Sequence, residues 1–81
     1  MDHRRQFFTD SIDQAKEAIA RYTNSAEQDE AFVQEFKTTD PAIAEIYRGW
    51  KKFNLDKIAL LRSRMTELTS AFAKEYPDIQ R

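Results

Sequence analysis

Two ladders of apolar side chains, one near each end of the chain, restrict the fold more than any other feature. The N-terminal ladder consists of Phe8, Ile12, Ala15, Ile19 and Tyr22, and the C-terminal ladder of Ile58, Leu61, Met65, Leu68, Phe72 and Tyr76. Steps of three and four residues keep the members of a ladder on one stripe of an α-helix. We therefore expect an all-α protein whose N- and C-terminal helices pack antiparallel through these stripes.

Two helix-start signals lie between the ladders. Ser25 with Gln28 three residues later matches a capping box, and Thr23 just before it favours a break in the chain. Asp40 followed by Pro41 is the second signal, because proline suits the first helical position and an aspartate can accept a backbone N–H there. Helices are thus expected to begin near residues 26 and 41.

The segment around Asn54 leaves two alternatives open. Asn54 can cap a new helix that begins at Leu55, yet the apolar stripe also runs on through this point with one inserted step. The sequence predicts a small bundle of three to four helices in one domain, residues 1–81. The expected helices are 5–22, 26–37, 41–53 and 55–76, with the last two either tightly joined or continuous.

The composition is that of a small globular helical protein. Of 81 residues, 41% are hydrophobic and 33% charged, with one glycine and two prolines. A chain this short sits near the lower size limit for a single core, so a partner or self-association would help to stabilise it. No apolar run is long enough to span a membrane, and no secretory signal is visible near Met1. The absence of cysteine fits a reducing compartment, and we expect a cytoplasmic protein.

Charge is unevenly distributed along the chain. Residues 1–47 carry five basic and ten acidic side chains, whereas residues 48–64 carry six basic side chains and one acidic. The basic stretch is either neutralised by the acidic part of the fold or free to bind an anionic partner. A small nucleic-acid-binding regulator that uses residues 48–64 is therefore an alternative function, although a pI of about 5.8 and a poor helix-turn-helix match around Gly49 make it weak.

Catalysis and metal binding have little support in the sequence. The only histidine is His3, in a terminal segment that cannot hold it as a general base. Acidic side chains near Asp29 and Glu30 lack the spacing of a calcium loop, and a lone glycine cannot build a phosphate-binding loop. We expect no enzymatic activity, no catalytic residue, no metal, no cofactor and no small-molecule substrate.

Aromatic residues give the best indication of a binding surface. The segment from Tyr47 through Trp50 to Phe53 is interleaved with basic side chains, and Trp, Tyr and Arg are enriched at binding hot spots. These rings are either core or interface, with Ile43 and Ile46 on the same expected apolar face. Phe7 lies about 100° off the N-terminal ladder and needs separate cover. The predicted partner-binding residues are Arg48, Trp50, Lys51, Lys52 and Phe7.

A short part of the chain resembles a known family. Asp40-Pro41-Ala42-Ile43, the spacing from Asp40 to Tyr47, and Asn54-Leu55 are similar to the helical hairpins of type III secretion needle subunits. The N-terminal ladder and Trp50 depart from that pattern, and the chain is not assigned to the family. The resemblance implies a further alternative, a secreted hairpin subunit that forms a polymer.

The sequence therefore predicts a non-enzymatic helical module that acts by protein–protein contact. It would work as a homo-oligomer or as a small adaptor, inhibitor or chaperone-like partner. The identity of the partner, the oligomeric state and the pathway do not follow from the sequence.

Overall fold

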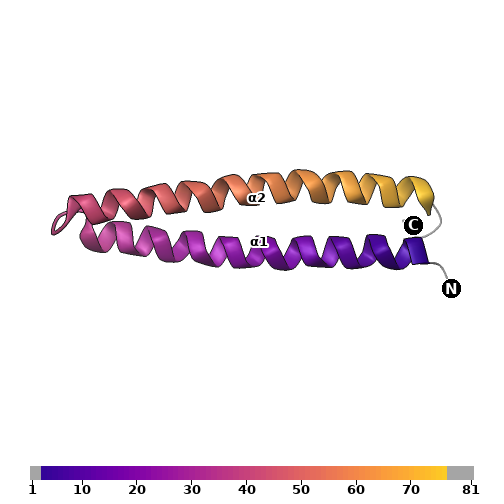
Figure 1. Ribbon diagram of the computed structural model, residues 1–81, viewed down its shortest axis with the longest axis horizontal. Helices are drawn as coiled ribbons and strands as arrows, with labels where there is room; N and C mark the ends of the chain where they lie inside the picture. Colours follow the sequence, from indigo (N-terminus) through magenta and orange to yellow (C-terminus); the bar gives the residue numbers. More distant parts are fainter. Residues whose placement is uncertain (1–2, 77–81) are drawn as a thin grey trace.

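The chain folds into two long helices that lie side by side in opposite directions. A computed structural model describes residues 3–76, with α1 spanning His3–Phe36 and α2 spanning Pro41–Glu75 (Figure 1). A short connection joins them at one end, and the start of α1 and the end of α2 lie at the other. The all-α prediction is confirmed, but the expected three to four helices are wrong, because the described residues form two. The molecule measures 58 × 18 × 18 Å.

α1 runs without interruption through the predicted break at residues 23–25. The Thr23 hydroxyl donates a hydrogen bond to the Ile19 carbonyl oxygen at 2.7 Å, so this side chain bonds within the helix and does not end it. The apolar ladder also continues beyond Tyr22 with the same steps, and Ala26 and Val33 are buried against α2. Packing along this extended stripe overrides the local capping signal at Ser25.

The start of α2 agrees with the sequence prediction. Asp40 is the N-cap, its carboxylate accepts the Ile43 backbone N–H at 3.2 Å, and Pro41 occupies the first turn. α2 then continues to Glu75, one residue before the expected end, and the expected stop at Pro77 lies outside the described residues. Of the two alternatives at residues 53–55, the continuous helix is confirmed.

The two ladders meet as predicted and form the seam between the helices. The rings of Phe8 and Phe72 lie edge to face, 5.9 Å apart, near the open end of the hairpin. Further along, Ala15 and Ala26 on α1 and Ile58 on α2 are buried. No large side chain among the described residues is completely buried, because two helices alone cannot enclose a core.

A polar pair interrupts this apolar seam near its middle. Asn54 does not cap a helix but lies inside α2, and its side-chain amide donates to the Asp29 carboxylate at 2.7 Å. Both residues are only 9% exposed. Beside them, the Lys51 ammonium lies 3.4 Å from the Glu30 carboxylate at the edge of the seam. Buried polar pairs of this kind fix the register of packed helices, since a shifted register would leave both groups without a partner.

Ile58 tests whether the ladder is the stabilising core. Ile58→Ala should lower the free energy of unfolding by about 2–4 kcal/mol, because it removes buried methyl groups and leaves a cavity. Leu55→Ala, at a half-exposed site one turn away, should cost less than about 1 kcal/mol. Urea denaturation followed by circular dichroism at one fixed protein concentration measures both. Equal losses would show that the seam is not the core.

The polar pair makes a second prediction about stability. Asp29→Leu should lower the free energy of unfolding by about 1–3 kcal/mol, because the buried Asn54 amide then lacks an acceptor. Asn54→Leu should be similarly destabilising. The double variant should regain most of the loss, since two apolar side chains leave no unsatisfied group. A double-mutant cycle from urea denaturation measures this coupling, and additive losses would contradict the paired role.

Candidate interaction surface

A second apolar stripe runs along α2, outside the seam. Its members are Ile46, Trp50, Phe53, Lys57 and Leu60, again at steps of four and three residues, so they share one side of the helix. The four apolar members expose between 53% and 59% of their surface. The Lys57 ammonium lies 5.4 Å from the centre of the Phe53 ring, which is a cation–π contact within the stripe.

Aromatic stacking joins this stripe to α1. Phe32, also partly exposed, stacks on Tyr47 with 4.8 Å between ring centres, and Tyr47 in turn meets the edge of Trp50 at 5.1 Å. These contacts place Phe32 and Trp50 on the same side of the hairpin. We call this surface the aromatic face. It consists of Phe32, Ile46, Trp50, Phe53 and Leu60.

The α1 half of this side carries polar side chains at regular intervals. Arg21, Gln28 and Glu35 follow one another by seven residues, and all three are exposed. They continue a row that starts at Phe7 and Gln14, both of which line one shallow depression together with Arg64 of α2. Arg64 extends the α2 stripe by a further step of four from Leu60. The row on α1 and the stripe on α2 therefore lie on the same side of the hairpin.

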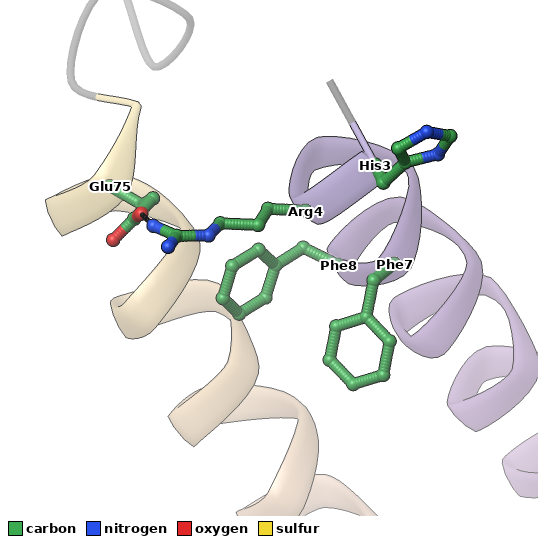
Figure 2. Close-up of a pocket in the computed structure, with 5 residues that line it drawn as sticks. All are labelled: His3, Arg4, Phe7, Phe8 and Glu75. Atoms are coloured by element: carbon green, nitrogen blue, oxygen red, sulfur yellow. Dashed lines mark hydrogen bonds and ion pairs between the residues drawn. The ribbon is translucent and has the colours of Figure 1, made fainter. Parts of the chain in front are cut away.

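Phe7 lies at the far end of this side, near the termini, and exposes 61% of its surface. Figure 2 shows the Phe8 ring directed toward α2, with Phe7 beside it and His3 pointing away from α2. The two phenylalanine rings meet edge to face at 5.7 Å. Above them the Arg4 guanidinium forms an ion pair with Glu75 at 2.6 Å, which joins the two helices at the open end.

The opposite side of the hairpin carries one exposed large hydrophobic side chain among the described residues, Leu55. A depression near its middle is lined by Thr23, Ala26, Glu27, Glu30, Lys51, Leu55 and Ile58, and apolar atoms form most of its surface. The exposed large apolar side chains are therefore concentrated on one long side of the hairpin. An exposed apolar surface of this extent is typical of a binding site.

The structure divides the five predicted partner-binding residues between these two sides. Trp50 belongs to the aromatic face, and Phe7 lies on the same side but at the other end. Arg48 and Lys52 are each two residues from Trp50, about 200° around the helix, and so project elsewhere. Arg48 pairs with Glu45 at 2.8 Å, and Lys52 with Asp56 at 3.6 Å. Lys51 reaches Glu30 at the seam. A binding role for these residues stays a prediction.

Four of the five members of the aromatic face are absent from the predicted partner-binding residues, namely Phe32, Ile46, Phe53 and Leu60, although Phe53 ends the aromatic segment that indicated a binding surface. From the sequence, Ile46 belongs to an apolar helix face that the expected bundle would bury. Leu60 was not assigned at all. The step pattern from Ile46 to Leu60 was the available signal, since it repeats the seam pattern on a different side of the same helix.

The basic stretch does not form one continuous charged surface. Its six cations are distributed around a continuous helix, and three of them have carboxylates nearby, as described above. Gly49, the expected turn of a helix-turn-helix, lies inside α2. Among residues 3–76 there is no cluster of three side chains able to hold a metal ion, and neither helix is apolar enough over its length to cross a membrane.

Comparisons with known proteins do not assign the chain to a family. No family model matches it, and neither the curated proteins nor the solved structures gave a match.

Gly49 permits a simple test of the continuous helix. Its backbone is helical, and a Cβ atom there would meet nothing within 4 Å. Gly49→Ala should therefore raise the free energy of unfolding by about 0.5–1 kcal/mol through helix propensity alone. Thermal or urea denaturation measures this gain. A loss of stability would instead indicate that the chain bends at this glycine.

Proposed function

We propose that the protein is a non-enzymatic helical interaction module that binds other copies of itself through the aromatic face. The observation that carries this proposal is the exposure of Ile46, Trp50, Phe53 and Leu60 on one side of a hairpin only 18 Å thick. A second hairpin packed on this side would bury these side chains. The single layer of two helices would then become a four-helix bundle with an enclosed core. In this role the protein acts in the cytoplasm.

The residue types of the aromatic face suit tight association. Tryptophan is enriched among hot-spot residues, and large rings bury much apolar area at a small cost in side-chain entropy. The stacking of Phe32, Tyr47 and Trp50 holds these rings in place before binding, so little further ordering is needed. The side of each hairpin away from the aromatic face stays exposed to water in such an assembly.

A secreted, polymer-forming hairpin subunit is the second candidate function. The observation that favours it is the architecture itself, two long antiparallel helices joined by a short connection that ends at Asp40-Pro41. This is the arrangement that the resemblance of residues 40–55 to type III secretion needle subunits implies. The two candidates differ in the product of assembly, which is a closed oligomer in the first and an open series of increasing mass in the second.

Trp50 and Phe53 test the proposed association. The wild-type protein should sediment as an oligomer whose fraction rises with concentration. Trp50→Ser and Phe53→Ser should each weaken this association by about 30-fold or more, the effect of losing a hot-spot residue. Their helical circular dichroism should be unchanged, because neither ring lies in the seam.

Leu55→Ser is the matched control, since Leu55 is similarly exposed on the opposite side. It should leave the oligomer intact. A wild-type protein that remains monomeric at every accessible concentration would contradict the proposal, as would equal effects of Leu55→Ser and Phe53→Ser.

A further inference from the structure

The arrangement of side chains on the aromatic face specifies how a second copy would dock. We propose that two hairpins pack face to face with their connections at opposite ends, related by a two-fold axis that passes beside Gln28 of α1 and Phe53 of α2. This inference rests on the proposed self-association and assigns it a geometry. The product is a staggered antiparallel four-helix bundle.

The stripe on α2 can pair with the same stripe of a second copy that runs in the opposite direction. When α2 is laid antiparallel on a second α2 and centred at Phe53, the two Phe53 rings meet each other. Ile46 then meets Leu60 of the second copy, and Trp50 meets Lys57, which is a cation–π pair. An isologous interface requires this self-complementarity, because the same surface serves both copies.

The row on α1 can likewise pair with the same row of a second copy that runs in the opposite direction. Centred at Gln28, an antiparallel α1 pair brings Arg21 of each copy to Glu35 of the other, seven residues on either side of the centre. Both side chains are exposed, and they carry opposite charge. Two copies of this contact form in a two-fold dimer, while the Gln28 amides can bond to one another.

These two centres lie at the same height along the hairpin. The Lys51 ammonium lies 3.4 Å from the Glu30 carboxylate, so residue 30 of α1 is about level with residue 51 of α2. Because the helices are antiparallel, two residues earlier on α1 and two residues later on α2 lead in the same direction, to Gln28 and Phe53, the centres of the two rows. A single axis can therefore satisfy both rows at once, although they belong to different helices.

Other arrangements of two hairpins fit these charges less well. If the two connections lay at the same end, α1 would pack on α2 at the same height, and Arg21 would meet the cations Lys57 and Arg64 of the second copy. If antiparallel hairpins overlapped over their whole length, Phe53 would lie opposite Ser63 and Arg64. Like charges and buried polar groups both oppose association.

The staggered overlap is large enough for a stable dimer. It covers about 25 residues of α2, or about 38 Å at the rise of an α-helix. With a width of 18 Å, each copy buries roughly 600–700 Å², which reaches the lower part of the range for specific interfaces. The half of each hairpin that carries Phe7 and the Arg4–Glu75 ion pair extends beyond the overlap.

Charge reversal tests the geometry. Arg21→Glu and Glu35→Arg should each weaken the homodimer about tenfold, because two like-charge contacts replace two attractive ones. An equimolar mixture of the two variants should recover a dimer of wild-type stability, since both contacts then join unlike charges. Arg62→Glu is the control, because Arg62 follows Leu55 by seven residues and lies on the side opposite the aromatic face. Sedimentation equilibrium measures all four samples.

Cysteine cross-linking tests the position of the axis. The chain has no cysteine, so Gln28→Cys should form a covalent dimer under mild oxidation, whereas the matched Gln14→Cys should remain uncross-linked. Gln14 occupies the same row, but it lies two helical repeats from the axis. Equal cross-linking at both positions would overturn the proposed axis.

The possible results separate the geometry from the proposed function. A wild-type monomer would overturn both. A wild-type dimer that ignores charge reversal and does not cross-link through Gln28→Cys would overturn only the geometry. An open series of masses above the dimer would also overturn the two-fold arrangement and would favour the polymer. A dimer that is weakened about tenfold in each single variant and restored in their mixture supports the proposal.

Discussion

The register of the hairpin depends on the hydrogen bond between the Asn54 amide and the Asp29 carboxylate. The apolar ladders favour antiparallel packing but repeat every seven residues, so they alone would tolerate a shift by one repeat. A buried amide and carboxylate tolerate none, because a shift would leave each without a partner in an apolar seam. This pair brings Phe32 beside Tyr47 and Trp50 and thereby creates a surface that spans both helices.

The sequence was sufficient to predict the helical class, the antiparallel contact of the two ladders and the cap at Asp40, since each follows from a regular spacing or from backbone chemistry. It was not sufficient to predict the number of helices. Ser25 and Gln28 form a convincing capping box, yet the ladder also continues through Ala26 and Val33. Which of these prevails depends on whether a long partner helix lies opposite, and local sequence does not contain that information.

The same limitation affected the candidate site. Trp50 stands out by its residue type, but the sequence places Ile46 on a face that a larger bundle would bury. In a two-helix hairpin nothing among the described residues covers that face. Arg48 and Lys52 were grouped with Trp50 because they are close in sequence, whereas on a helix a neighbour two residues away points to a different side. A site on a helix is better sought at steps of three and four residues.

No large side chain within residues 3–76 is fully buried, and this determines how the hairpin opens. Each turn of α1 packs only on the turn of α2 beside it. The free energy of unfolding is therefore a sum of local contributions along the hairpin, as in a repeat protein, and does not depend on one common core. Opening can then proceed inward from the free ends like a zipper, held first by Arg4 and Glu75, while the Asp29–Asn54 region remains closed. Amide hydrogen exchange in such a molecule forms a gradient along its length.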